Sequence, residues 1–478
     1  MRQGCIIVLD VGKSLAKLTL WSPARRLMDR RTRPNAHPGS GLYPSLDKDG
    51  IGVWLAQTLV DFARQGDIAA IIPVGHGAAA CILDEAGHCL APLDYEAEPP
   101  AEILAAYRAL RGSFDLTGSP ALPCGLNLGL QLFWLERLLP QAMRRGRILP
   151  WPQYWAWLLS GVSASEATSL GCHSDLWQPR QGRPSPLALS RGWADRLAPL
   201  RRAGDVLGPV TEDWRNRCGL PADCMVLCGL HDSNAALLAA RLYPETEGTD
   251  CTVLSTGTWF VAMRPGVADA ALAENRDCLV MADAFGAPIA ASRFMGGREA
   301  EMLEQGLPID PAGESDALLG RAQEAITAGV MALPAFQPGV GPFPERTGNW
   351  IARPRDQVSR RAVAGLYLAL MADASLSLIG SRERLVIEGR FAGDPVFTRT
   401  LAALRPDQAI YLSAEEDNVP LGALTLVDGR LAAGAALTRA QPLAAAGLKG
   451  YAAAWRARAG QNTKKKQHQG AWDDDANA

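Results

Sequence analysis

Two stretches of the chain share one pattern of hydrophobic and polar positions. Each begins with a run of apolar residues, passes through a short polar turn that contains glycine, and continues as a second apolar run, at residues 6–20 and 252–262. This pattern is typical of a β-hairpin. The sequence therefore predicts two similar strand–turn–strand units, one in each half of the chain.

Both predicted turns have a composition that suits a phosphate group. Glycine and small hydroxyl residues let donors approach phosphate oxygens, lysines supply positive charge, and a carboxylate can hold a divalent metal ion. The residues are Asp10, Gly12, Lys13, Ser14 and Lys17 in the first unit and Ser255, Thr256, Gly257 and Thr258 in the second. The repeated arrangement predicts a nucleotide held between two related domains.

The remaining pattern predicts an α/β protein. Apolar runs at 68–74, 224–228 and 385–388 are typical of buried strands, and a proline- and glycine-rich segment at 178–186 predicts a surface loop. Helical spacing and capping residues predict helices at 101–110, 126–139, 151–159, 192–200 and 360–379, and a further helix that begins at Asp394-Pro395. We expect an inserted helical layer over a sheet in the first half.

The length of 478 residues indicates two large domains. The polar, turn-forming segment 243–250 predicts a boundary near residue 248, which gives domains at 1–248 and 249–458. Residues 459–478 combine a lysine triplet with an aspartate triplet and contain few core-forming residues. We interpret them as a disordered tail rather than as a surface for nucleic acid or membrane.

Composition favours small-molecule chemistry. Apolar residues make up 48% of the chain, charged residues make up 21%, and the formal net charge of -2 leaves no basic footprint for nucleic acid. No apolar run approaches the roughly 20 residues that span a bilayer, and Asp10 interrupts the amino-terminal apolar segment before a signal peptide is complete. We expect a cytoplasmic protein without a nucleic-acid or membrane partner, and a homodimer is left open.

One cluster of thiols offers a zinc site as an alternative interpretation. Cys218, Cys224, Cys228 and His231 fall within a short segment, but they contain no CxxC pair. The segment 224–228 instead predicts a buried strand, in which both cysteines pack as small apolar residues.

The order of these motifs resembles the FGGY family of carbohydrate kinases across roughly residues 5–455. The segment 10–14 is similar to the first phosphate motif of that family, Gly229-Leu230-His231-Asp232 to its catalytic-base motif, and 254–259 to its second phosphate motif. The Ser-Thr-Gly-Thr-Trp and His-Asp sequences most resemble the branch that includes rhamnulose and fuculose kinases. The order and spacing of the motifs are more specific than any single motif.

The resemblance implies two ribonuclease H-like, actin-like ATPase domains that flank a central active-site cleft, with ATP and Mg²⁺ as cofactors. Asp10 would hold the metal ion, and the other turn residues would bind phosphates. Asp232 would act as general base on a sugar hydroxyl, although an aspartate that only caps the helix predicted at 233–241 remains an alternative. The expected sugar contacts are His76, Gly77, Asp94, His231 and Asp232.

The sequence departs from the family pattern where adenosine is expected to bind. Many relatives have consecutive glycines there, whereas this chain has Gly389-Arg390-Phe391. An arginine can stack on adenine, but the bulky pair can also narrow a pocket, so Gly389 and Arg390 are expected to affect nucleotide affinity.

The leading hypothesis is therefore a kinase that phosphorylates a hydroxyl of a small ketose, such as a deoxyketose or a pentulose. A catalytically impaired actin-like sensor of sugar or nucleotide is the alternative, motivated by the altered turn at Gly389. An ATP-driven chaperone or filament protein of the same fold is a third interpretation. The sequence names neither the sugar nor the hydroxyl.

Overall fold

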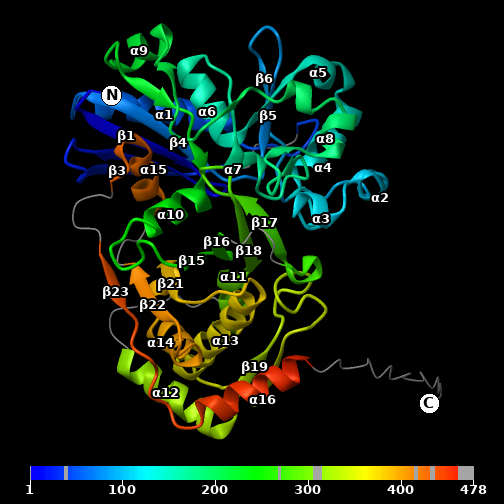
Figure 1. Cartoon of the computed structure of the whole chain (residues 1–478), viewed down its shortest axis with the longest axis vertical. Helices are drawn as coiled ribbons and strands as arrows, with labels where there is room; N and C mark the ends of the chain where they lie inside the picture. Colours follow the sequence, from blue (N-terminus) through cyan, green and yellow to red (C-terminus); the bar gives the residue numbers. More distant parts are fainter. Residues whose placement is uncertain are drawn as a thin grey trace, which may run out of the picture.

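The computed structural model describes residues 2–36, 41–266, 271–304, 315–413, 418–430 and 436–460. Two α/β domains lie one above the other along the long axis, with the N-terminal domain at the top of Figure 1. Each domain is built on a seven-stranded sheet. The two predicted hairpins are the first two strands of these sheets, so the predicted strand–turn–strand units are confirmed.

The N-terminal sheet has the strand order β12-β13-β4-β1-β2-β3, and β14 pairs with β4 beside β13. β1, β2 and β3 are antiparallel neighbours, whereas β4 runs parallel to β1 and β13 runs parallel to β4. The strands are β1 (Cys5–Val11), β2 (Leu15–Trp21), β3 (Leu27–Pro34), β4 (Ile68–Gly75), β12 (Val206–Pro209), β13 (Met225–Leu227) and β14 (Leu230–His231).

The C-terminal sheet repeats this arrangement. β15, β16 and β18 are antiparallel neighbours, β21 runs parallel to β15, and β22 runs parallel to β21. The strands are β15 (Cys251–Thr256), β16 (Phe260–Pro265), β17 (Cys278–Ala282), β18 (Pro288–Phe294), β21 (Arg384–Gly389), β22 (Ala409–Ser413) and β23 (Leu437–Arg439). An antiparallel meander followed by parallel strands, found twice, is the ribonuclease H-like topology of actin-like ATPases, which confirms the expected fold class.

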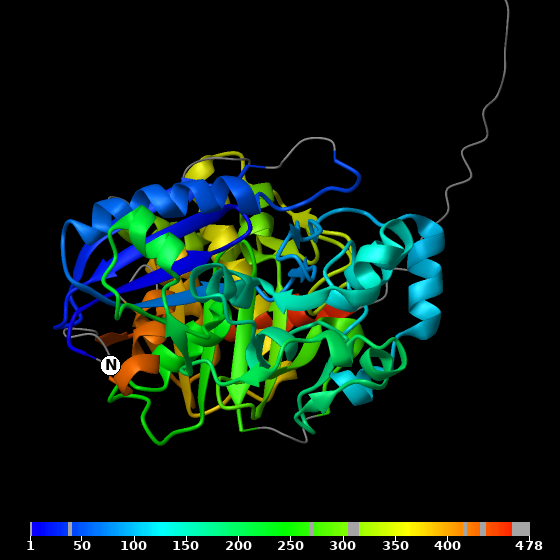
Figure 2. The same cartoon turned by 90° about the horizontal axis from the view of Figure 1, so that it is seen from above.

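Helices cover the N-terminal sheet and extend it at one end. Figure 2 shows the meander strands at one side of this domain and α2 with its neighbouring helices at the other. These elements are α1 (Lys48–Ala63), α2 (Ala101–Leu110), α3 (Phe114–Thr117), α4 (Leu128–Leu138), α5 (Pro140–Arg145), α6 (Trp151–Ser160), α7 (Ala167–Leu170), α8 (Pro186–Ser190), η1 (Ala194–Arg196), α9 (Glu212–Cys218) and α10 (Asp232–Ala240). The helical layer predicted over the first sheet is present.

Short strands complete the N-terminal domain. β5 pairs with both β6 and β7, and two-stranded pairs join β8 to β11 and β9 to β10. They are β5 (Ala80–Leu83), β6 (Cys89–Leu90), β7 (Arg147–Pro150), β8 (Ser165–Glu166), β9 (Trp177–Gln178), β10 (Arg183–Pro184) and β11 (Leu200–Arg201). The segment predicted as a loop at 178–186 is thus the exposed tip of a small hairpin whose base is buried.

The C-terminal domain is organised around one long buried helix, α13. Its N-cap Asp356 accepts a hydrogen bond from the backbone of Ser359, and fourteen of its 22 residues are buried. The helix is long and apolar enough to cross a membrane, but 78% of its most apolar window is buried inside the domain, as expected for a core helix. The other elements are η2 (Glu274–Arg276), α11 (Gly296–Glu304), α12 (Ser315–Ala328), β19 (Met331–Leu333), β20 (Asn349–Ile351), α13 (Gln357–Leu378), η3 (Arg390–Gly393), α14 (Pro395–Leu404), α15 (Asn418–Asp428) and α16 (Leu448–Gly460).

Two helices from different halves of the sequence pack together between the sheets. α10 and α15 make the most extensive helix contact, and Leu421 and Leu424 of α15 share a buried cluster with Ile6 and Val8 of β1. Figure 1 shows α15 beside β1 and α10, above the C-terminal sheet. Although α15 follows residue 248 in sequence, it therefore contributes to the core under the N-terminal sheet.

Several local predictions can be compared with these elements. Cys224 and Cys228 are fully buried at the two ends of β13, as predicted for small apolar residues. Asp394 caps α14 by accepting from the backbone of Phe397, which confirms the predicted helix start. The helix predicted at 192–200 is wrong: only one 3-10 turn forms there, because Gly192 has a positive φ of 67° and Pro199 disfavours helix before it. α16 runs to Gly460, and the rest of the predicted tail, 461–478, lies outside the described residues.

Candidate active site

A cavity of about 500 Å³ lies between the two domains. Both hairpin turns, the loop after β4 and the start of α10 line it. Thirteen of the residues singled out from the sequence meet there: Asp10, Gly12, Lys13, Ser14, Lys17, His76, Gly77, His231, Asp232, Ser255, Thr256, Gly257 and Thr258. Asp94, Gly389 and Arg390 do not line the cavity.

Asp10 lies at the end of β1 and faces Lys17 across the hairpin. The two residues are register partners, and the Lys17 ammonium is 3.5 Å from the Asp10 carboxylate. Burial raises the pKa of Asp10 to about 6, with the Asp232 carboxylate adding to the increase and Lys17 opposing it. Two carboxylates on one cavity wall make a favourable place for a cation. Asp10 therefore fits a magnesium ion held by one carboxylate and by substrate phosphates.

Asp232 is the first residue of α10, directly after β14. The N-cap position belongs to His231, whose side chain makes no capping hydrogen bond. The Asp232 carboxylate accepts from the backbone of the adjacent Ser233 at 2.5 Å, and its side chain keeps 28% exposure toward the cavity. The interpretation of Asp232 as a simple N-cap is therefore weakened, because a cap would bond to the amides two or three residues on.

His231 lies between Asp232 and Cys172. Its Nε2 atom lies 3.3 Å from the Asp232 carboxylate and 3.8 Å from the Cys172 sulfur. Burial alone would lower the pKa of His231, but the neighbouring Cys172 thiolate and Asp232 carboxylate outweigh it and raise the pKa to about 9. The protonated ring therefore places a hydrogen-bond donor beside the Asp232 carboxylate.

His76 presents a free donor to the cavity. The backbone amide of Ala78 donates to its Nδ1 atom at 3.3 Å, which leaves the hydrogen on Nε2. Burial lowers the pKa of His76 to about 4, so the ring is neutral. Nε2 is buried and, among the residues that the structure describes, has no hydrogen-bond partner. An Nε2–H group aimed at a cavity is suited to an oxygen of a bound ligand.

Gly77 follows His76 where the backbone passes close to Cys172. A Cβ atom at this position would lie 2.9 Å from the Cys172 Cβ and 3.1 Å from a ring carbon of His231. Glycine therefore allows the close packing that brings His76 and His231 to the same cavity wall.

Lys13 points at the loop after β6 instead of into open space. Its ammonium pairs with the Asp94 carboxylate, lies 3.6 Å from Glu96 and sits 4.8 Å from the centre of the Tyr95 ring. Asp94 also accepts from the backbone of Glu96 at 2.9 Å. The carboxylate predicted to contact sugar directly is thus turned to Lys13 and to its own loop, and it is Tyr95 and Glu96 that line the cavity.

The second hairpin turn is held in place by hydrogen bonds to the end of β21 and the turn after it. The Thr256 hydroxyl donates to the backbone carbonyl of Glu388 and accepts from the amide of Phe391 at 3.1 Å. This hydroxyl is therefore committed to the protein, which argues against its predicted use as a phosphate donor. Gly257 is packed so closely against α11 that a Cβ at Gly297 would lie 2.3 Å from its carbonyl oxygen. The Ser255 side chain hydrogen-bonds to the Glu388 carboxylate, so the exposed Thr258 remains the hydroxyl donor of this turn.

The turn at Gly389 lies beyond the cavity. Gly389 has a φ of 81°, and a Cβ there would lie 2.3 Å from the Thr256 carbonyl oxygen, so glycine is required. Arg390 is exposed, lies 3.8 Å from Glu301 of α11 and stands over the Phe391 ring. Its predicted contact with adenosine stays a prediction.

Sixteen of the 29 described residues that line the cavity were not singled out from the sequence as site residues, and four of them are described here. Cys172 and Tyr95 line the N-terminal wall, and Trp259 and Arg293 line the C-terminal wall. Trp259 is the last residue of the second phosphate motif, so the sequence could have indicated its place in the cavity. Arg293 sits on a strand and is brought to the cavity by sheet register alone, which a single sequence does not reveal.

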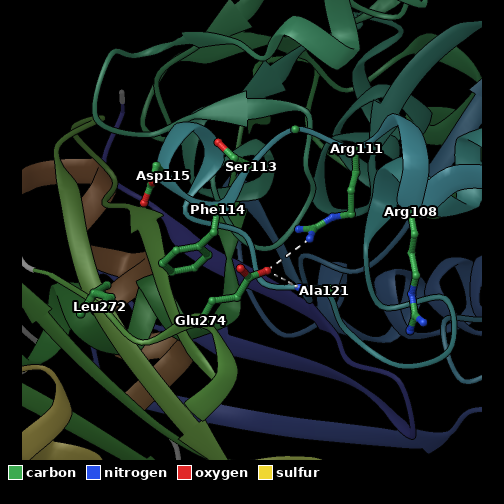
Figure 3. A pocket seen from close by; sticks show the side chains of 9 residues that line it. Arg108, Arg111, Ser113, Phe114, Asp115, Ala121, Leu272 and Glu274 are labelled. Carbon is green, nitrogen blue, oxygen red and sulfur yellow. Dashed lines mark hydrogen bonds and ion pairs between the residues drawn. The ribbon is translucent and has the colours of Figure 1, made fainter.

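A second cavity of about 500 Å³ marks another contact between the domains. In Figure 3 the side chains of Arg111 and Glu274 point toward each other across it. Arg111, at the end of α2, donates to Glu274 of η2 at 3.2 Å and to the buried carboxylate of Asp175 at 3.1 Å. The amide of Ala121 donates to the same Glu274 oxygen at 3.2 Å. The N-terminal insertion thus reaches the C-terminal domain here.

Two ribonuclease H-like domains with paired phosphate-type turns and facing carboxylates in the cleft define an actin-like phosphotransferase. A carbohydrate kinase from Novosphingobium aromaticivorans is 46% identical in sequence, and its crystal structure superposes over 95% of this chain and 100% of its own with a TM-score of 0.88. Residues 248–436 match the family described as "Carbohydrate kinase FGGY, C-terminal domain". The chain belongs to the FGGY family of carbohydrate kinases.

Two further relatives are more distant. The ligand-bound xylulose kinase from Lactobacillus acidophilus is 14% identical, with a TM-score of 0.75 over 95% of this chain and 96% of its own, and shares the fold. A rhamnulokinase from Ligilactobacillus salivarius (strain UCC118) is 30% identical over 115 residues. That match spans 24% of this chain and 23% of the rhamnulokinase.

Proposed function

We propose that the protein transfers the terminal phosphoryl group of ATP to a hydroxyl of a small ketose, such as a deoxyketose or a pentulose. The observation that carries the proposal is the meeting of Asp10, Asp232 and both phosphate-type turns in one cavity between the domains. The partial match to a rhamnulokinase supports a deoxyketose within that class.

Asp232 acts as the general base. Its carboxylate takes the proton from the attacking sugar hydroxyl, and the His231 side chain lies beside it at 3.3 Å. His76 and Asp232 line the same cavity, and the neutral His76 ring offers a second contact to a small sugar bound at Asp232. The proton leaves the hydroxyl as its oxygen forms the bond to phosphorus, and ADP leaves with the electrons of the broken bond.

The two turns position the phosphates. Ser14 of the first turn and Thr258 of the second offer hydroxyl donors from opposite sides of the cleft. Asp10 is the residue that would hold Mg²⁺, which supplies charge neutralisation at the transferring phosphoryl group when bound. Lys17 is already paired with Asp10, and it offsets negative charge from the same side.

A sugar or nucleotide sensor without turnover is the alternative. This alternative is supported by the position of Arg390, which lies beside Glu301 and does not line the cavity. The deciding experiment is Mg²⁺-dependent ADP release from ATP across a panel of neutral ketoses, aldoses and polyols, with a control without sugar. Stimulation by one or a few ketoses is expected. ATP binding without stimulation by any sugar would favour the sensor.

A further inference from the structure

Arg293 lies on the C-terminal wall of the cavity in a fixed position. It belongs to β18, is 6% exposed and donates through Nε to the Asp277 carboxylate at 2.8 Å. The other oxygen of Asp277 accepts from the amide of Gly341 at 3.1 Å. The Cζ atom of the guanidinium lies over the Trp259 ring, 4.6 Å from the ring centre. Both partners restrict the arginine to one orientation.

Asp277 does not engage the whole guanidinium. Nη2 of Arg293 is buried and, within the part of the chain that the structure describes, has no hydrogen-bond partner. A buried N–H of a charged group without an acceptor is costly, so such groups normally meet a ligand or water. His76 lines the same cavity from the N-terminal domain and has an unpartnered, buried Nε2 atom. Each domain thus contributes to the lining of a single cavity a residue with an unpartnered nitrogen.

We propose that Arg293 determines sugar specificity by donating, through Nη2, to an oxygen of a neutral sugar that also contacts the N-terminal wall. The inference rests on the proposed kinase function and adds a contact from the second domain. A sugar held by donors of both domains stabilises their closed arrangement, so that sugar binding favours the conformation in which the two phosphate turns face each other.

Most of the charges that line the cavity are balanced within the protein. Arg293 is paired with Asp277, and Lys13 is paired with Asp94. Lys17 is paired with Asp10, the His231 ring lies 3.3 Å from the Asp232 carboxylate, and Arg298 adds positive charge to the same lining. A hydroxyl or carbonyl oxygen of a neutral sugar can accept from Arg293 without breaking its ion pair with Asp277.

The test is the variant Arg293→Lys in the full chain. Lysine can still pair with Asp277 but lacks the second, planar donor. The sugar KM is expected to rise about 10- to 100-fold, the range for one hydrogen bond from a charged group, while the ATP KM changes less than about twofold. Arg264→Lys is the matched control. Arg264 is a buried arginine on neighbouring β16 that pairs with Asp250 outside the cavity, so its replacement should lower Tm without changing the sugar KM.

A panel of deoxy analogues of the preferred ketose distinguishes a direct sugar contact from a purely structural role of Arg293. The analogue without the contacted oxygen should lose kcat/KM with the wild type but not with Arg293→Lys. An unchanged sugar KM in Arg293→Lys, or equal losses on every analogue, would overturn this inference alone. If the wild type phosphorylates no sugar, the proposed function falls, and this inference falls with it.

Discussion

The ammonium of Lys17 lies 3.5 Å from the carboxylate of Asp10, because the β1–β2 register places the two residues directly opposite each other. This pair sits at the cavity end of the first sheet, where parallel neighbour β4 also ends. Polar residues that follow the ends of adjacent strands gather at one edge of a sheet. The same rule brings His76 and Asp232 to the same cavity.

The pKa of Asp10 predicts how activity depends on pH. Because this pKa is raised from 3.8 to about 6, mainly by burial, the carboxylate form decreases as the pH falls through 6. Mg²⁺-dependent turnover should therefore decline between pH 7 and pH 5, and excess Mg²⁺ should move the decline to lower pH by competing with the proton. A profile that is flat over this range at limiting Mg²⁺ would contradict the assignment of Asp10 as the metal ligand.

Replacement Asp10→Asn separates function from stability. A group with a raised pKa in the folded state favours folding most below its unfolded pKa and loses that contribution as the pH rises through the folded pKa, here from about 4 to about 6. The neutral amide avoids this loss, so Tm at pH 8 should be equal to or higher than that of the wild type. The difference should narrow below pH 6. Turnover should be lost at every pH, and a large drop in Tm at pH 8 would contradict the argument.

Asp232→Asn tests the general base. Turnover should fall about 10²- to 10⁴-fold, because the amide cannot take the hydroxyl proton. ATP affinity, measured by calorimetry, should stay within about threefold, since the contacts to phosphate lie on other elements. Asp356→Asn is a matched control at the start of α13, where asparagine caps as well as aspartate, and it should leave turnover unchanged. Full sugar-dependent turnover in Asp232→Asn would remove the base assignment.

Arg390→Ala tests the turn after β21. If adenosine lies against Arg390, the ATP KM should rise about three- to tenfold, and the sugar KM should stay constant. Arg353→Ala is the control, because it removes another exposed arginine from an aromatic face, that of Trp350, without approaching this turn. Equal ATP KM values for the two variants would exclude Arg390 from the nucleotide site.

Glu274→Arg tests the second contact between the domains. The new arginine would face Arg111, and the domains should separate more often. Strand β17 offers the readout, because the amides of Val280 and Ala282 donate across the domain boundary to the carbonyls of Gly118 and Gly171 at 2.8 Å. Their hydrogen exchange should accelerate about 2- to 10-fold. Glu324→Arg, which breaks an exposed pair with Arg321 within α12, should leave these two amides unchanged.

The sequence predicted local structure correctly where interactions between neighbouring residues determine that structure. The two hairpins, the helix at 101–110 and the Asp394 cap depend on alternation, on helical spacing and on one side chain bonding to nearby amides. The residues of the family motifs that line the cleft could also be predicted, because each follows a predicted strand. The helix expected at 192–200 was wrong, because Gly192 has a positive φ and Pro199 disfavours helix before it, although Trp193 is buried as its apolar character suggests.

Only the tertiary structure decided which polar side chains already have partners within the protein. The sequence alone determined the fold class, the two phosphate-type turns and the candidate pair Asp10 and Asp232, since these depend on local pattern and on motif order. It could not show that the Thr256 hydroxyl is spent on Glu388, that Lys13 is held by Asp94, or that Arg293 keeps an unpaired donor. Two hydrogen-bond partners can lie more than a hundred residues apart in the sequence, as Thr256 and Glu388 do. Sheet register and domain packing decide which residues meet.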